Sequence, residues 1–215
     1  MSFLHQLKQQ ARALQSEQGG QQQGQEANMA ATEAACKIVW NYFTELPRQL
    51  NVIEPAAVQL GLDSKTPWPN MKQTDFRFDA RKKRLRDKEV FDYLALGWRL
   101  APREGEPLQG RVSVNFPPDL ERVQRRLHAG HVVHERQEQR HPESNALLAI
   151  IFEYEMAARA SVMVTPDHDN LVLKFRLGCV GGMEVVNTSV PAAQLNGAVL
   201  DELARLIVGE PSRFL

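Results

Sequence analysis

Four of the six histidines lie between positions 128 and 141, in the segment HAGHVVHERQEQRH, among glutamates and arginines. Imidazole nitrogens bind metal ions and transfer protons near neutral pH. His131 and His134 are the candidate metal ligands of this segment. Their odd spacing places them on opposite faces of a strand, and the sequence contains neither an HExxH nor a CxxC pattern. The segment therefore predicts a polar strand at a sheet edge, with no metal bound.

Two glutamates in the segment IIFEYEMAARA could act as a catalytic pair. Glu153 and Glu155 would share one face of a strand, with their carboxyl groups roughly 6–7 Å apart. Some hydrolases hold two carboxylates at such a separation. A cross-strand charge ladder with Arg159, Lys174 and Arg176 would explain both glutamates without catalysis. We expect this structural role.

His168 is a further candidate catalytic residue, because it lies between two aspartates in the segment TPDHDN. A carboxylate that orients an imidazole can make it a general base. The sequence contains no GxSxG motif and no P-loop to accompany such a base. Pro166 before the aspartates and Asn170 after them favour a turn.

The segment ARKKRLRDKE, residues 80–89, is the densest basic run of the chain. Such a run can contact the phosphates of RNA or DNA, usually with exposed aromatic side chains beside it. Phe76 and Phe78 precede the run but fall on the expected core face, and Asp87 and Glu89 reduce its charge. We expect a solvated hairpin tip. The candidate nucleic-acid contacts are Arg81, Lys82, Lys83, Arg84 and Arg86.

The composition limits the classes of function. The chain has 215 residues, of which 43% are hydrophobic, enough for one sizeable core. Lysine and arginine number 26, as do aspartate and glutamate, so no net charge attracts the chain to nucleic acid or membrane. The two cysteines, Cys36 and Cys179, are far apart, which favours a reducing compartment. Without a signal peptide or a long apolar run, the expected location is the cytoplasm, with no cofactor.

The first residues predict a helical arm. Leu4, Leu7 and Leu14 recur at helical spacing within residues 1–17. Residues 18–26 are rich in glutamine and glycine, which is typical of a flexible linker. A helix this short is not stable alone. Its leucine face is therefore expected to pack on a protein partner, most simply on a second copy of the chain, with docking on its own domain as the alternative.

The remainder of the chain predicts an α+β fold. Apolar residues alternate with polar ones from Thr74 onward, a helix follows Pro117, and a last helix ends at Gly209. The even-numbered apolar positions from 148 to 164 predict one long strand or two strands joined by a bend, with a buried helix as the alternative. The expected fold is a curved, mainly antiparallel sheet of about six or seven strands with helices packed on one face. The expected organisation is an arm and linker over 1–26 and a single domain over 27–215.

Two hairpins follow from the pattern of this region. Gly181 and Gly182 predict a tight turn that places Leu177 opposite Val186. The hairpin before it is expected to bring apolar residues opposite one another. The predicted pairs of that hairpin are Val164–Leu171, Val162–Leu173 and Ala160–Phe175.

The segments DFRFDARKKRLRDKEVFDY and LDELARLIVGEPSRFL resemble stretches of bacterial proteins of about this length. The resemblance would extend over nearly the whole chain, and it implies a self-contained bacterial protein. It implies no activity, cofactor or catalytic residue.

These observations favour a cytoplasmic binding or interaction protein that is not an enzyme. One alternative is a small-molecule-binding protein or hydrolase with a pocket between the sheet and the C-terminal helix. Another is a nucleic-acid-binding protein that uses the hairpin tip at 81–88. A protruding N-terminal helix would favour the first reading, a pocket lined by ionisable groups the second, and a continuous basic patch the third.

Overall fold

The computed structural model describes the backbone of residues 3–63 and 65–215, and the side chains of Lys8 and of residue 23 onward except residue 64. Within these residues the chain forms three α-helices, one short 3-10 helix and eight strands. The elements in chain order are α1 (Phe3–Ile53), β1 (Met71–Leu85), β2 (Lys88–Pro102), β3 (Gln109–Val114), α2 (Pro117–Ala129), β4 (His134–Arg140), β5 (Leu147–Glu155), β6 (Ala158–Asp167), β7 (Val172–Gly178), β8 (Val185–Pro191), η1 (Ala192–Gln194) and α3 (Gly197–Val208).

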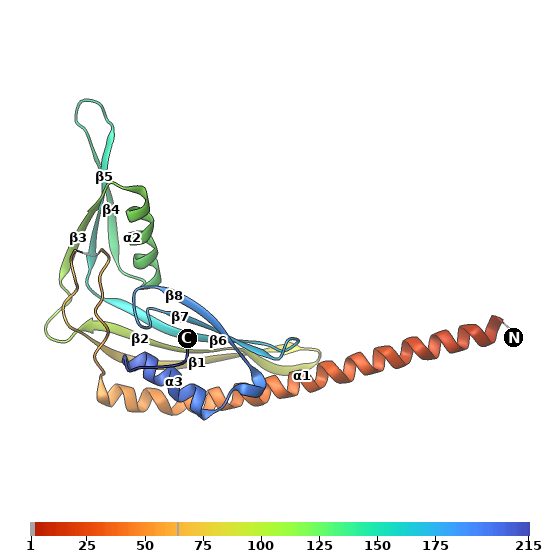
Figure 1. Cartoon of the computed structure of the whole chain (residues 1–215). Coiled ribbons are helices and arrows are strands. Elements are labelled where there is room, and N and C mark those ends of the chain that lie inside the picture. The colour runs from red at the N-terminus through yellow and green to blue at the C-terminus, as the bar shows by residue number, and fades with distance from the viewer. Residues whose placement is uncertain (1–2, 64) are drawn as a thin grey trace.

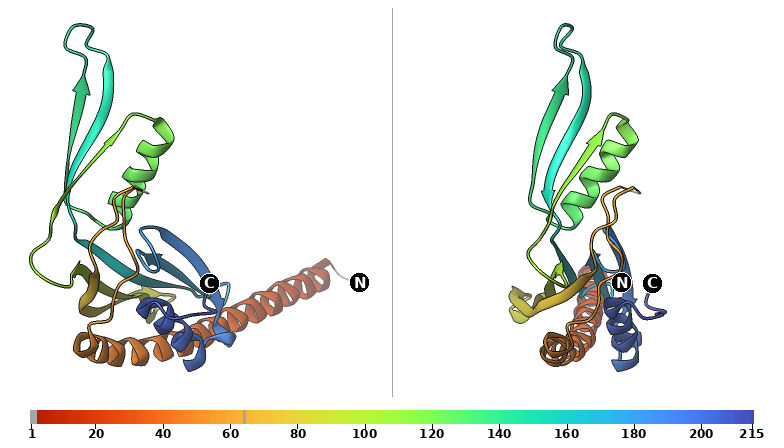
Figure 2. Two further views of the ribbon diagram at one scale, coloured as in Figure 1. Left: turned by 60° about the vertical axis from the view of Figure 1, so that its left-hand side comes forward. Right: turned by 90° about the vertical axis from the view of Figure 1, so that its left-hand side faces the viewer.

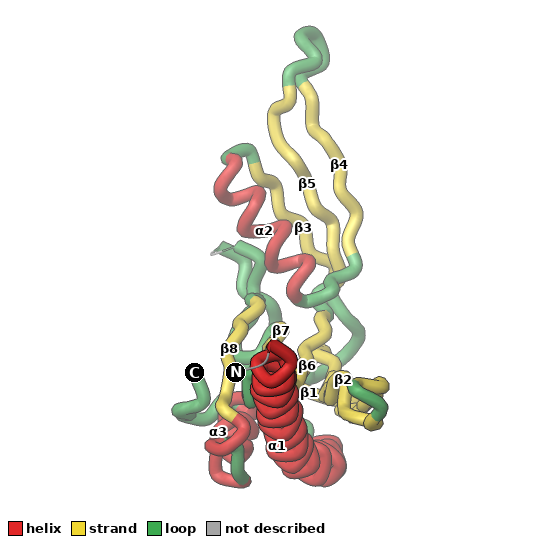
Figure 3. Tube along the Cα trace, turned by 90° about the vertical axis from the view of Figure 1, so that its right-hand side faces the viewer, coloured by secondary structure: helices red, strands yellow, loops and turns green. Residues whose placement is uncertain are grey.

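The strands form two antiparallel sheets, one in the order β1-β2-β6-β7-β8 and the other in the order β3-β5-β4. Figure 1 shows the three-stranded sheet and α2 standing at one end of the five-stranded sheet. α1 and α3 lie together along one face of the larger sheet (Figure 2), and α2 runs beside the smaller sheet (Figure 3). The expected α+β class with antiparallel strands is confirmed, with the strands divided between two sheets rather than gathered in one.

α1 is a single helix of 51 residues, about 77 Å long at 1.5 Å per residue. It continues through residues 18–26, so the flexible linker expected there is wrong. Glutamine is a good helix former, and the segment extends a helix that the core already holds, so it needs no new nucleus. Pro47 lies inside the helix. α1 ends just before Glu54, whose φ of 43° is left-handed and which precedes Pro55.

The apolar faces of α1, α3 and the five-stranded sheet form the main core. Phe43 of α1, Leu94 and Leu96 of β2, and Leu200 and Leu203 of α3 are completely buried. β2 alternates buried and more exposed residues along its second half, as the period-two pattern predicted. One face of this sheet is therefore covered by helices, and the other carries the polar side chains.

A β-bulge shifts the side chains at the start of β1. Thr74 pairs with Arg99 while Arg77 pairs with Gly97, so β1 has one extra residue. Asp75 lies in the bulge with a φ of 58°. The shift keeps Phe76 in the core, at 3% exposure, and turns Arg77 to the polar face beside Gly97.

The even-numbered apolar run from 148 to 164 forms two strands joined by a bend, as one of the expectations had it. β5 ends at Glu155, β6 begins at Ala158, and the two strands belong to different sheets. The alternative of a buried helix is wrong. Leu148 is exposed because it lies at the far end of the β4–β5 hairpin. The bend therefore connects the three-stranded sheet to the five-stranded sheet.

The register expected between β6 and β7 is wrong by four residues. Val164 lies opposite Phe175 rather than Leu171. β6 runs on through Pro166, whose missing N–H costs no bond to β2, because the β2–β6 ladder stops at Val164. An even offset keeps every side chain on its expected face. The next hairpin has the expected register, with Leu177 opposite Val186, but the tight turn expected at Gly181 and Gly182 is replaced by a longer loop over 179–184.

Candidate functional site: the base of the projecting helix

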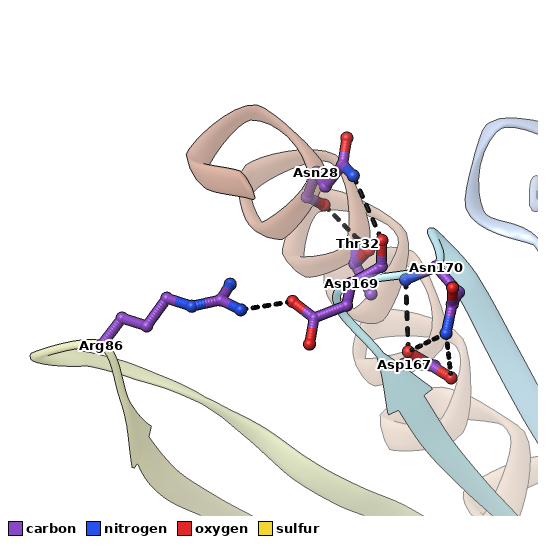
Figure 4. A network of polar contacts seen from close by, with 6 residues as sticks. All are labelled: Asn28, Thr32, Arg86, Asp167, Asp169 and Asn170. Carbon is purple, nitrogen blue, oxygen red and sulfur yellow. Dashed lines mark hydrogen bonds and ion pairs between the residues drawn. The ribbon is translucent and has the colours of Figure 1, made fainter. Parts of the chain in front are cut away.

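α1 leaves the body of the protein at two turns that come from distant parts of the sequence. Figure 4 shows that Asp169, in the turn between β6 and β7, bonds both to Arg86 and to Asn28. Arg86, at the tip of the β1–β2 hairpin, donates from Nη2 to Asp169 Oδ1 at 2.6 Å. Asn28 of α1 donates from Nδ2 to the Asp169 carbonyl oxygen at 3.2 Å. Asp169 thus links the hairpin tip to the helix.

A more buried contact lies one turn further along α1. Glu33 Oε1 accepts from the backbone N–H of Phe91 at 3.0 Å and lies 2.8 Å from His168 Nε2. The His168 side chain is only 3% exposed and that of Glu33 18%. Because a carboxylate only accepts hydrogen bonds, Nε2 carries the proton. The candidate base His168 is thereby placed in a contact that joins β2, α1 and the β6–β7 turn.

Asp167 stabilises the turn that carries His168. Its carboxylate accepts from Lys174 Nζ at 2.8 Å and from the side-chain and backbone nitrogens of Asn170 at 3.0–3.2 Å. The hydrogen bond from Lys174, followed by those from Asn170, lowers the pKa of Asp167 from 3.8 to about 2. This carboxylate is therefore ionised in the folded protein wherever the fold persists above that pH.

The lowered pKa predicts a pH-dependent contribution of Asp167 to stability. The folded carboxylate binds a proton at lower pH than the unfolded one, so its contribution is fully present above about pH 4 and is lost as the pH falls toward 2. The difference in free energy of unfolding between the wild type and Asp167→Asn should therefore be constant near neutral pH and shrink below pH 4. Urea unfolding at several pH values measures it. A difference that stays constant down to pH 3 contradicts the assignment.

The basic run is largely neutralised by neighbouring acids. Lys82 pairs with Glu89 at 3.1 Å and Lys83 with Asp92 at 2.9 Å, and Arg84 pairs with Asp87 at 3.0 Å. Arg86 is engaged with Asp169, as described above, and Arg81 is exposed on the same strand. These ion pairs favour a role for the hairpin tip in holding α1. They argue against a continuous basic surface that binds nucleic acid.

The histidine-rich segment forms a polar edge strand, as expected. Every residue of β4 is exposed, and β4 lies at one edge of the three-stranded sheet. His134 Nδ1 lies 2.8 Å from the Val132 carbonyl oxygen, whereas His131 is in the preceding turn, with a φ of 47°. Among the residues whose side chains the structure describes, no group of three or more histidine, cysteine, aspartate or glutamate residues is arranged to hold a metal ion.

Glu153 and Glu155 of β5 lie opposite other residues than the basic ones expected. Arg159, Lys174 and Arg176 belong to the five-stranded sheet, so the ladder expected with them is wrong. Glu153 instead lies between Arg111 and Glu135 in the register, with Arg111 Nε 3.8 Å from Glu153 Oε1. Glu155 lies opposite Gln109. The bend between β5 and β6 separates these glutamates from the basic side chains that follow them in sequence.

The candidate contact residues of the arm, Leu4, Leu7 and Leu14, lie on the helical backbone of α1, and their side chains are outside the described part of the structure. Sequence reasoning missed Glu33 and Asn28 at the base of the arm. Glu33 and His168 are 135 positions apart, and no local pattern indicates such a pair.

A cavity of about 700 Å³ is lined mainly by the loop after α1 and the loop between β7 and β8, with Leu206 as its one residue from the C-terminal helix. Its lining includes Leu206 of α3, Met183 and the ionisable Arg126. Arg126 donates from Nη1 to the carbonyl oxygens of Gly61 and Leu62 at 3.2 and 3.3 Å. Its guanidinium is thus partly occupied in holding the loop that follows α1.

No helix of the described residues is both long and apolar enough to cross a membrane. None of the protein-family models, curated proteins or solved structures compared with this chain matches it. The functional argument therefore depends on the geometry of the molecule.

Proposed function

We propose that this protein is a non-catalytic cytoplasmic binding protein that assembles with a second copy of itself through the arm, the part of α1 from residue 3 to residue 25. The observation that carries this proposal is the course of α1. The helix passes the sheet and continues beyond the body of the protein (Figures 1 and 2). At 1.5 Å per residue the arm is about 35 Å long.

An uncovered helix of this length is marginal in water, since most helical stability in proteins comes from packing an apolar face. The sequence places Leu4, Leu7, Ala11 and Leu14 at alternating spacings of three and four, which is the pattern of a helix-pairing seam. Two copies can cover each other's seams. The contacts of Asn28 and Glu33 support this role, because they hold the direction of the arm relative to the body.

Deleting residues 1–22 tests the proposal. The truncated chain keeps Asn28 and Glu33, so its melting temperature should change little, while its mass in light scattering should fall from that of an assembly to that of a monomer. The full chain carrying both Leu7→Glu and Leu14→Glu should behave in the same way, because buried charges disrupt an apolar seam. Gln9→Glu, off the seam, is the matched control and should keep the assembly.

A full-length chain that is monomeric at every accessible concentration contradicts the proposal. So does an assembly whose mass is the same with and without the arm. A large loss of melting temperature on truncation would show instead that residues 1–22 stabilise their own domain.

A further inference from the structure

A cavity of about 350 Å³ lies on the face of the five-stranded sheet opposite α1. Its lining residues come from β1, β2, β6 and the turn after α2. These elements lie near the place where the smaller sheet stands on the larger one (Figure 1). The residues that carry the argument are Arg77, Gly97, Arg99, His131, Arg159 and Ser161.

The register of three strands builds this cavity. Arg77 of β1, Gly97 of β2 and Ser161 of β6 lie in one row across the sheet. In the next row on the same face, Arg99 lies directly opposite Arg159. Gly97 has no side chain, and a Cβ built there would meet nothing closer than the Ala160 carbonyl oxygen at 4.0 Å. A hollow is therefore left at Gly97, with arginines around it.

The bulge in β1 supplies the third arginine. If β1 continued from Thr74 in regular register, without the bulge, Phe76 would pair with Gly97 and lie on the polar face. With it, Arg77 takes that place, and its Nε lies 2.9 Å from Asp75 Oδ1. Bulges occur often beside functional sites, where they redirect a side chain.

The charges around the hollow are not balanced. Three arginines and one aspartate line it, which gives a formal charge of +2 with His131 neutral. Like charges directly opposite each other destabilise a sheet. In the part of the chain that the structure describes, neither Arg99 nor Arg159 has a carboxylate within ion-pair distance. An anion between the two guanidinium groups would remove this repulsion.

Hydrogen-bond donors without partners also line the hollow. Within the described residues no side-chain hydrogen bond engages the Ser161 hydroxyl or the His131 imidazole. The Ser161 hydroxyl lies in the same row as Arg77 and Gly97, beside the hollow, so it can donate to an anion bound there.

We propose that this cavity binds the phosphate group of a small molecule. Arginine presents a planar fork of donors that matches phosphate oxygens, and two opposed forks with a hydroxyl beside them suit a tetrahedral anion. The volume is near the lower end of small-molecule pockets, enough for a phosphate with a small organic part. The site does not depend on the arm, so the two proposals can fail separately.

Calorimetric titration at constant ionic strength tests the proposal, with inorganic phosphate and phenyl phosphate as ligands and chloride as the reference anion. Both phosphates should bind and raise the melting temperature by mass action, while chloride should not. Tighter binding of phenyl phosphate would identify an organic phosphate as the natural ligand, and tighter binding of inorganic phosphate would identify the free ion.

Arg99→Gln and Arg159→Gln should each weaken phosphate binding roughly tenfold or more. Without phosphate both variants should be at least as stable as the wild type, because the opposed charges are relieved. Arg176→Gln is the matched control. Arg176 is an exposed arginine on the same sheet, opposite Met163 and away from the hollow, so its loss should leave binding unchanged.

Gly97→Val offers a test that removes no charge. Its Cβ would come no closer than 4.0 Å to the backbone, so the protein should fold, and the valine side chain should occupy the hollow and remove phosphate binding. Phosphate that binds no better than chloride overturns the proposal, as does an equal loss of affinity in Arg176→Gln. RNA that binds more tightly than either phosphate and depends on Arg99 would identify a nucleic-acid surface instead, and would overturn it as well.

Discussion

Glu33→Ala is expected to lower the free energy of unfolding by about 3 kcal/mol. Glu33 Oε1 is the partner of two buried groups, the backbone N–H of Phe91 and Nε2 of His168. Each buried group left without a partner costs roughly 1–3 kcal/mol. Urea unfolding monitored by tryptophan fluorescence measures the change.

Glu45→Ala on the same helix is the control for this loss. Glu45 is 64% exposed and pairs with Arg48 in a surface i,i+3 contact, which contributes at most about 0.5 kcal/mol. Equal losses for the two substitutions would show that Glu33 is not the anchor of α1. Glu33→Gln should lie between wild type and alanine, since an amide oxygen can still accept hydrogen bonds.

Gly110→Ala is expected to destabilise the protein by about 3 kcal/mol, at the upper end of the usual cost of overpacking. A Cβ at Gly110 would lie 2.4 Å from Cζ of Tyr154, its partner across the β3–β5 ladder. Tyr154 is 2% exposed and stacks on Trp68 at 5.9 Å, so the ring cannot move aside. The strain therefore falls on the joint between the smaller sheet and the loop after α1.

Thermal unfolding of Gly110→Ala checks this expectation, with Gly182→Ala as the matched glycine control. A Cβ at Gly182 meets nothing within 4 Å, so that variant should unfold close to the wild-type temperature. A Gly110→Ala protein as stable as the control would show that Tyr154 does not fill the space beside β3.

Local patterns predicted the strands and turns well, because the side-chain period of a strand is visible in the sequence. The charged tip proved to be a two-residue turn at 86–87, and the glycine pair at 181–182 lies in the loop over 179–184 that joins β7 to β8. The division of the even-numbered run between two sheets could not be predicted, because the bend at Met156 preserves the alternation. The β6–β7 register was missed because an offset of four residues also places apolar side chains opposite one another.

The residues of the two sites could be predicted only in part. His168, Arg86 and the arm were singled out, but their partners Glu33, Asp169 and Asn28 come from distant segments. Arg99 and Arg159 meet only because β2 and β6 are neighbours in the sheet, and Arg77 joins them through a bulge. Neither the order of the strands nor the bulge is visible in the sequence around these arginines.

The most direct test of the proposed assembly is a dipolar electron-spin measurement on the arm. Lys8 is exposed, so Lys8→Cys accepts a nitroxide label. Cys36 and Cys179 are 0% and 3% exposed, and burial raises the pKa of each thiol to about 12, so both resist labelling near neutral pH. We expect dipolar coupling between labels on two copies, which should weaken on dilution with unlabelled chain and disappear when Leu7→Glu and Leu14→Glu are added. Absence of coupling at high protein concentration, or coupling that survives both glutamates, would contradict assembly through the arm.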